Sequence, residues 1–349
     1  MVEYLSGNRI QGSSTLTTAP PQTSWKELDR VTLTSAGDTL DTGTFTAKDN
    51  IMILENKIPT GNCRSKYQFN GDDNDNYAQR YSDNGGSEST FTTDPVIYAY
   101  QTGGTAKSFS VHSIINNSSQ EKLLIGDIVE NNSDGAGNEP NRRELVGKWA
   151  NTSAQINRVK LFNDGSGSFD TGSELVILGC DNDEVDSGTN FWQELGSTEL
   201  TSAGDDVTVS FTAKKYLMVE AYMVGGSGNN FRNAWKLNGV SSGSTYAYRK
   251  SSNGGSDNTY TSRNLLEIGD QDQEHDSYQK LFIVNPSGKE KLGIMHAVRE
   301  ENDSASDPSR TECALKWATT SGQITSITAH NDQSGNFGVG SYVKVWGAN

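Results

Sequence analysis

The chain has 349 residues, 36 of them glycine, with 33% hydrophobic and 21% charged residues and a formal net charge of -15. The acidic balance argues against binding along nucleic-acid phosphates, because that contact needs a basic face. No stretch approaches the ~18 continuous apolar residues of a membrane span, and residues 1–7 lack the basic and apolar parts of a signal peptide. We therefore expect neither a nucleic-acid nor a membrane partner, and a length of this order predicts about two domains.

The cysteines, Cys63, Cys180 and Cys313, do not form a recognisable framework. They are too few and too widely spaced for a set of disulfides, and they lack the C-x-x-C spacing of zinc or redox sites. Each domain is large enough to bury a core without such links.

The main feature of the sequence is a tandem repeat. Residues 25–28 (WKEL) return as 192–195 (WQEL), and residues 33–38 (LTSAGD) return as 200–205, both at an offset of 167. Further matches follow in the same order at nearly the same offset: 45–48 with 211–214, 77–80 with 246–249, 84–87 with 253–256, 121–123 with 290–292, and 148–150 with 316–318. A period of this length is a whole domain and is far longer than a solenoid or propeller unit.

The repeat divides the chain into four parts. Residues 1–23 have no counterpart and combine glycine, proline and hydroxyl residues, which indicates an extended N-terminal arm. Copy 1 covers residues 24–179, an acidic linker covers 180–190, and copy 2 covers 191–349.

Both copies have the pattern of all-β domains. The run 174–178 (ELVIL) is continuously apolar after Glu174, which is typical of a strand buried on both faces. Apolar and polar residues alternate over 206–211, which places Val207 and Val209 on one face of a strand. Several short strands in domains of this size predict two tandem β-sandwiches, jelly-roll-like in form.

Turn residues predict how the strands are connected. Residues 144–150 and 155–162 flank a polar turn and predict a hairpin, which 312–318 and 323–329 repeat. Asn70-Gly71 and Asn238-Gly239 are further hairpin signals. The triplets at 84–86 and 253–255, each Asn-Gly-Gly, predict turns with positive φ.

No catalytic or metal site is predicted. The histidines, His112, His275, His296 and His330, do not fall at matching positions of the two copies, and 44 acidic residues do not single out a catalytic carboxylate pair. The acidic loop 71–76 has the composition of a calcium loop but lacks the EF-hand glycine and distal glutamate, which favours a solvated turn. We expect a protein that is not an enzyme and has no cofactor.

Several aromatic residues recur in both copies and are predicted to lie in the core. They are Trp149 with Trp317 and Phe169 with Phe337. Arg142 and Arg310 also correspond, each between a proline and a glutamate, which favours a role in holding a loop onto a strand.

Two Tyr–Arg pairs are the candidate ligand-binding residues. Tyr77 with Arg80, and Tyr246 with Arg249, lie between predicted turns and offer an aromatic ring and a guanidinium for a sugar or a carboxylate. A structural Tyr–Arg stack or an ion pair on the strand face explains the same residues equally well.

The amino-acid sequences of several blocks resemble those of a known group of proteins. These blocks are 4–12 (YLSGNRIQG), 119–123 (SQEKL), 140–144 (PNRRE), 148–153 (KWANTS) and 169–175 (FDTGSEL). They are similar to a domain of predicted virion proteins of marine phages and archaeal viruses. The resemblance covers both copies and residues 1–23, although copy 2 keeps only Pro308, Arg310 and Glu312 of the PNRRE block.

The resemblance implies a structural or attachment role in a virion. On this hypothesis the protein is a capsid decoration, head-fibre or tail-attachment component that forms homo-oligomers and binds other virion proteins through its arm and edge strands. It would be assembled in the host cytoplasm and exposed outside the cell, where loops such as 72–76 could contact a host-surface glycan. Two alternatives remain: a carbohydrate-binding adhesin module and an extracellular filament subunit.

Overall fold

The computed structural model describes residues 2–5, 9–12, 25–101, 105–182, 190–225, 231–268, 275–300 and 307–349. These residues form strands and turns without a helix, so they include no helix that is long and apolar enough to cross a membrane. The chain falls into two compact units. Unit 1 comprises Met1–Ser82, Ser87–Ile128 and Arg143–Gln193, and unit 2 comprises Asp83–Gly86, Val129–Arg142 and Glu194–Asn349.

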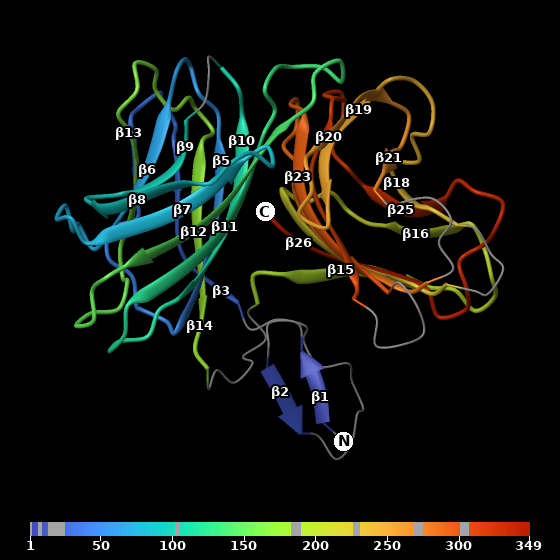
Figure 1. Cartoon of the computed structure of the whole chain (residues 1–349), viewed down its shortest axis with the longest axis horizontal. Coiled ribbons are helices and arrows are strands. Elements are labelled where there is room, and N and C mark those ends of the chain that lie inside the picture. The colour runs from blue at the N-terminus through green and yellow to red at the C-terminus, as the bar shows by residue number, and fades with distance from the viewer. Residues whose placement is uncertain are drawn as a thin grey trace. The chain divides into compact units, whose positions relative to one another are not determined.

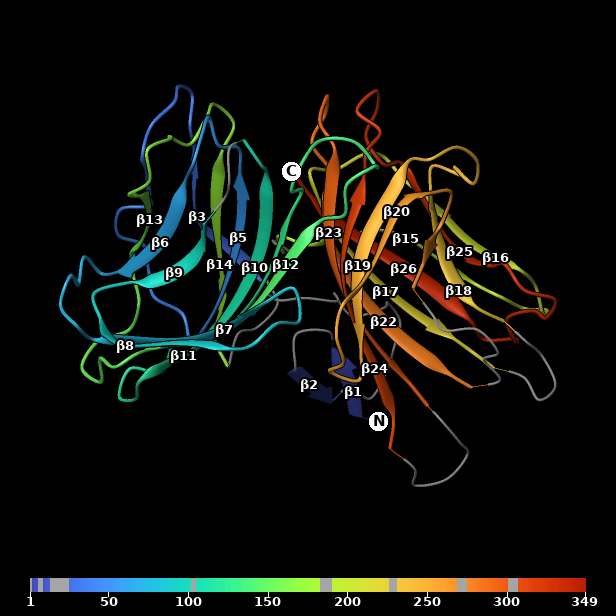
Figure 2. The same ribbon diagram turned by 45° about the horizontal axis from the view of Figure 1, so that its top comes forward.

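Each repeat copy folds into a sandwich of one eight-stranded and one four-stranded sheet (Figures 1 and 2). In the first sandwich the large sheet has the order β3 (Lys26–Thr32), β14 (Glu174–Cys180), β5 (Asn50–Lys57), β10 (Ser108–Ile115), β11 (Lys122–Glu130), β12 (Asn141–Trp149), β7 (Tyr77–Asp83) and β8 (Ser89–Asp94). Its small sheet has the order β4 (Thr39–Asp41), β13 (Val159–Asn163), β6 (Arg64–Phe69) and β9 (Ile97–Gln101).

The second sandwich repeats this arrangement strand by strand. Its large sheet has the order β15 (Gln193–Glu199), β26 (Tyr342–Ala348), β17 (Tyr216–Met223), β22 (Ser277–Val284), β23 (Lys291–Arg299), β24 (Ser309–Trp317), β19 (Tyr246–Ser252) and β20 (Asn258–Arg263). Its small sheet has the order β16 (Asp206–Ser210), β25 (Ser326–Asn331), β18 (Asn233–Leu237) and β21 (Leu266–Glu267). The prediction of an all-β chain with two tandem sandwiches is confirmed.

The N-terminal arm contains one antiparallel strand pair, formed by β1 (Val2–Leu5) and β2 (Arg9–Gly12). The rest of the predicted arm, and residues 183–189 of the predicted linker, lie outside the described residues.

The predicted hairpin at 144–162 is wrong. Strand β12 belongs to the large sheet and β13 to the small one, so the polar turn at 151–154 carries the chain from one sheet to the other. Strands β24 and β25 are related in the same way in the second sandwich. A polar turn between two strands specifies a reversal of chain direction, but it does not specify whether the strands pair edge to edge or face to face.

The Asn-Gly turns show the same distinction. Asn84-Gly85 joins the paired strands β7 and β8, whereas Asn70-Gly71 joins β6 and β7, which lie in different sheets. Asn70 and Gly71 have φ of 56° and 71°, the left-handed region where asparagine and glycine are favoured. The Asn70 Oδ1 accepts bonds from the backbone N–H groups of Asn157 (2.9 Å) and Arg158 (3.1 Å), which fixes the turn against the chain leading to β13.

The strand patterns read from the sequence are confirmed. All of β14 is buried, because it is paired on both sides, with β3 and β5, inside the sandwich. In β16, Val207 and Val209 are buried and the residues between them are exposed. The predicted core aromatics Trp149, Trp317, Phe169 and Phe337 are at most 1% exposed.

A Trp–Tyr–Lys cluster links the two sheets of each sandwich. In the first, Trp149 stacks on Tyr77 with ring centroids 6.3 Å apart, and the Lys122 Nζ lies 5.6 Å from the centre of the indole ring. In the second, Trp317 stacks on Tyr246 at 6.4 Å, and the Lys291 Nζ lies 5.3 Å from the indole. Burial lowers the pKa of both lysines. Each ammonium donates hydrogen bonds to two backbone carbonyls, which replace the water lost on burial.

The first sandwich also buries a polar cluster that the second lacks. The Glu55 carboxylate accepts bonds from the Tyr67 hydroxyl (2.6 Å) and the Ser110 hydroxyl (3.0 Å), and the His112 Nε2 lies 3.0 Å from that same Ser110 oxygen. The position that β10 gives to His112, paired with Ile53, is held in β22 by Leu281, paired with Val219.

His112 makes the stability of the first sandwich depend on pH. Complete burial lowers the pKa of its imidazole from 6.5 to about 4, so the folded chain holds the ring neutral while the unfolded chain protonates it. The contribution of neutral His112 is fully present above pH 6.5 and is lost as the pH falls toward about 4. We expect the free energy of unfolding to drop by about 3 kcal/mol over that interval.

The measurement is chemical denaturation at several pH values. His112→Leu, which installs the residue of the second sandwich, should remove most of this pH dependence, whereas the exposed control His296→Gln should keep it. Equal slopes for wild type and His112→Leu would contradict the assignment.

Candidate interaction face

The tyrosines of the two predicted binding pairs lie in the core. Tyr77 is 1% exposed, and its hydroxyl accepts a bond from the Phe69 N–H (2.9 Å) and lies 3.1 Å from the Asp72 carbonyl oxygen. Tyr246 is fully buried and makes the equivalent bonds to Leu237 and Val240. Burial raises the pKa of Tyr246 to about 12, so its hydroxyl remains a neutral donor. Neither ring offers a face to a ligand in solvent.

The arginines of the two pairs have different surroundings. Arg80 is exposed and forms an ion pair with Glu88. Arg249 is mostly buried, and its Nε donates to the Pro140 carbonyl (2.9 Å) while its Nη2 lies 3.3 Å from Glu139. The structure therefore does not bring Tyr77 beside Arg80, or Tyr246 beside Arg249, as an open binding pair; only Arg80 reaches solvent.

The acidic loop 71–76 is a structural turn. The Asp72 Oδ2 accepts a bond from the Trp149 Nε1 (2.7 Å), and the carboxylate also accepts bonds from the side-chain amides of Asn74 and Asn76. Partial burial raises the pKa of Asp72, but the bonds from Asn76, Trp149 and Asn74 outweigh it and lower that pKa overall. Among the described residues there is no group of three or more His, Cys, Asp or Glu side chains that could hold a metal ion.

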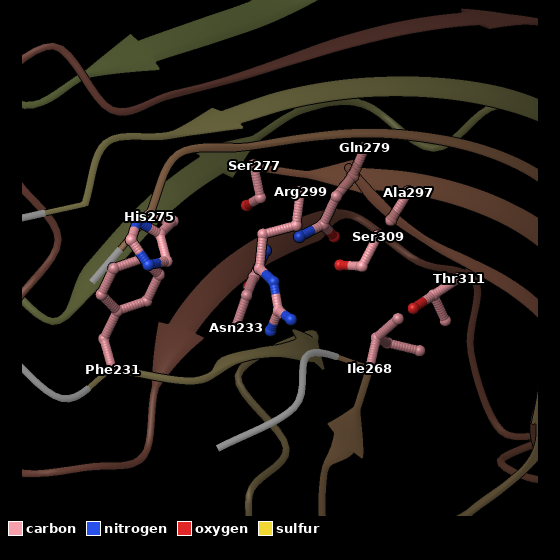
Figure 3. A pocket seen from close by; sticks show the side chains of 10 residues that line it. All are labelled: Phe231, Asn233, Ile268, His275, Ser277, Gln279, Ala297, Arg299, Ser309 and Thr311. Carbon is pink, nitrogen blue, oxygen red and sulfur yellow. The ribbon is translucent and has the colours of Figure 1, made fainter. Parts of the chain in front are cut away.

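A small cavity lies inside the second sandwich (Figure 3). Its volume is ≈30 Å³, and Figure 3 shows the Arg299 side chain extending among Asn233, Ser277 and Ser309. The Asn233 side chain and the Ser277 hydroxyl have no hydrogen-bond partner in the part of the chain that the structure describes. A space of this size suits one or two water molecules and is far too small for a sugar ring.

A wider groove lies on the outer face of the first sandwich. It has a volume of ≈580 Å³ and is formed by β7, β8, β11 and β12. Its apolar residues stand out from the sheet: Leu123 is 58% exposed, Ile125 64% and Val146 49%. We call this surface, formed by Arg80, Leu123, Ile125, Val146 and Lys148, the open face. Grouped aliphatic side chains with this exposure are typical of a protein interaction site.

The corresponding face of the second sandwich is covered. Leu292, Ile294 and Ala314 occupy the matching positions of β23 and β24, and they are only 3%, 6% and 2% exposed. None of them belongs to the inner core cluster, so they point outward.

The cover is the segment 129–142, which belongs to unit 2. Lys316 donates to the carbonyls of Asn131 (3.0 Å) and Ser133 (2.7 Å), and the Ser262 N–H donates to the Ala136 carbonyl (2.7 Å). These bonds fix the segment across the outer side of β20 and β24.

Sequence reasoning missed the open face. The run Leu123-Leu124-Ile125 is apolar throughout, and copy 2 repeats Leu123 and Ile125 as Leu292 and Ile294. The only available signal was the alternation that leaves Leu123 and Ile125 on one side of β11 and Leu124 on the other.

Comparisons with known proteins do not assign a family. No family model and no curated protein matches the chain. Among solved structures, the mouse laminin alpha1 chain, domains LG4-5, is similar at 10% sequence identity with a TM-score of 0.20, over 95% of this chain and 90% of that one. A likeness this weak carries no argument about function.

Asp72 should contribute to stability through Trp149. Asp72→Ala leaves the buried indole N–H without its acceptor, which we expect to cost about 1–3 kcal/mol in the free energy of unfolding. Asp75→Ala, an exposed change in the same loop, is the control and should cost under about 0.5 kcal/mol. Urea denaturation followed by tryptophan fluorescence measures both, and similar values for the two variants would contradict this role of Asp72.

The two equivalent faces should respond differently to the same substitution. Ile125→Asp places a carboxylate in solvent and should change stability by under about 0.5 kcal/mol. Ile294→Asp buries an unpaired carboxylate under segment 129–142 and should cost about 3 kcal/mol or more. Thermal denaturation of the two variants measures the contrast; an equally damaging Ile125→Asp would show that the open face is covered in the monomer.

Proposed function

We propose that this chain is a non-enzymatic structural protein of a virion, acting as a capsid decoration, head-fibre or tail-attachment component. Its partners are then further copies of itself and other virion proteins. It is assembled in the host cytoplasm and exposed on the released particle.

The observation that carries the proposal is the open face. A rigid sheet that exposes Leu123, Ile125 and Val146 over a groove of ≈580 Å³ has the character of a surface that a protein partner covers. Arg80 and Lys148 at this face, paired with Glu88 and Glu121, supply the polar rim that such interfaces use for register. The sequence resemblance of both copies and residues 1–23 to virion proteins supports the biological setting.

The carbohydrate-binding alternative has less support. Recognition of a sugar ring commonly uses an exposed aromatic face, and Tyr77 and Tyr246, the rings expected to provide one, are buried. The exposed apolar residues of the open face are aliphatic, which suits contact with another protein. The filament alternative shares the need for assembly and differs in where the protein is found.

Localisation tests the proposal. Gold-labelled antibodies against the purified chain, applied to virus particles and cells from the source material, should decorate particles and be seen by electron microscopy. Labelling confined to filaments on cell surfaces would overturn the virion assignment in favour of the filament. The wild-type chain should also give no signal on a glycan array; binding that is lost in Arg80→Ala would instead support the adhesin.

A further inference from the structure

We propose that the open face of one chain is the docking site for a second copy of the same chain, which inserts its β23–β24 connection there. Copies would then join head to tail. This inference deepens the proposed function, because it names the partner and the surface through which assembly occurs.

Unit 2 contains an example of this contact. Segment 129–142, which includes the connection between β11 and β12, lies across the outer side of β19, β20 and β24. Three side chains of that surface hold it. Lys316 donates to two of its carbonyls, Arg249 donates to the Pro140 carbonyl, and Glu290 accepts from the Gly135 N–H (2.5 Å).

The same three side chains are present on the open face. Arg80, Glu121 and Lys148 correspond to Arg249, Glu290 and Lys316 through the repeat. Their side chains are 55%, 41% and 43% exposed, and ion pairs join Arg80 to Glu88 and Lys148 to Glu121. Beside them, Leu123 and Ile125 repeat the chemistry of Leu292 and Ile294. The open face therefore has the polar anchors and the apolar floor of the covered one.

The inserting element is also duplicated. In segment 129–142 Pro140 and Arg142 are buried, and Arg142 donates to both carboxylate oxygens of Asp257, at 3.1 and 2.7 Å. Their counterparts Pro308 and Arg310, at the end of the β23–β24 connection, are exposed, and the Arg310 side chain, 60% exposed, lies 3.2 Å from Glu312. The backbone N–H of Arg142 donates to Asn84 Oδ1, and that of Arg310 donates to Asn253 Oδ1, both at 2.9 Å, so the two arginines start from the same local structure.

The charges match between copies. Arg142 pairs with Asp257 and approaches Glu312 (3.4 Å), and these two acids correspond to Glu88 and Glu144 beside the open face. Arg310 of a second chain therefore meets Glu88 and Glu144 in the place where Arg142 meets Asp257 and Glu312. After such a contact one chain of the pair still has its open face and the other still has its own Pro308 and Arg310 available, which is the property of a heterologous, continuing assembly.

The test is the mass of the purified full-length chain as a function of concentration, measured by analytical ultracentrifugation. Wild type should form a series of oligomers. Ile125→Asp, which blocks the face, and Arg310→Glu, which blocks the connection, should each raise the concentration needed for oligomers by about tenfold or more. Val339→Asp, a change at an apolar residue that is 61% exposed elsewhere, is the matched control and should leave assembly unchanged.

Mixing the two blocked variants identifies the geometry. The Ile125→Asp chain still has its connection and the Arg310→Glu chain still has its face, so an equimolar mixture should form 1:1 dimers and stop there. A mixture that remains monomeric, or a wild-type chain that is monomeric at its highest soluble concentration, overturns the inference. Oligomers that survive both substitutions also overturn it, because they use another surface.

These outcomes are independent of the localisation experiment. A monomeric wild type on labelled virus particles would refute head-to-tail docking while the virion role stands. Head-to-tail oligomers with label only on cell-surface filaments would refute the virion role while the docking stands.

Discussion

The link between the two sheets of each sandwich is the constraint on which the structure depends. Tyr77 lies on strand β7 of the large sheet, and its hydroxyl accepts a hydrogen bond from the backbone N–H of Phe69, at the end of small-sheet strand β6. Trp149 stacks on its ring, and Lys122 closes the cluster by binding two carbonyls. The three side chains are packed on one another, and the buried ammonium and hydroxyl each bond backbone groups that this packing holds in place. The same packing and backbone bonds recur with Tyr246, Trp317 and Lys291.

Elsewhere the two interiors have diverged. The first sandwich keeps Glu55, Lys57 and His112 inside, where the second has Ala221, Met223 and Leu281 at the positions that the strand registers match. A polar cluster at this depth is stable only if its hydrogen bonds are made, as they are from Tyr67 and Ser110 to Glu55 and from Lys57 to Ser65. The fold therefore accommodates both kinds of core around a shared Trp–Tyr–Lys cluster.

The sequence predicted the features that local pattern determines. The internal repeat separated the two sandwiches, alternation placed Val207 and Val209, and the recurrence of Trp149 as Trp317 identified core residues. It did not predict that β12 and β13 lie in different sheets, because sheet membership depends on contacts between residues far apart in the chain. The recurrence of Tyr77 suggested binding as readily as packing, since both preserve an aromatic residue, and only its burial distinguishes them.

The open face could not be predicted from the sequence for a related reason. Leu123 and Leu292 are the same residue in the same context, yet one is exposed and the other is covered by a segment far from it in sequence. What differs is the cover. The chain supplies segment 129–142 to the second sandwich, whereas Pro308 and Arg310, the counterparts of Pro140 and Arg142, are exposed. A duplicated domain in which one face is covered and the equivalent face is open has unequal ends, and a directional assembly requires unequal ends. The net charge of -15 opposes contact between copies in general, so a joint of this kind depends on local complementarity between Arg310 and the acids beside the open face.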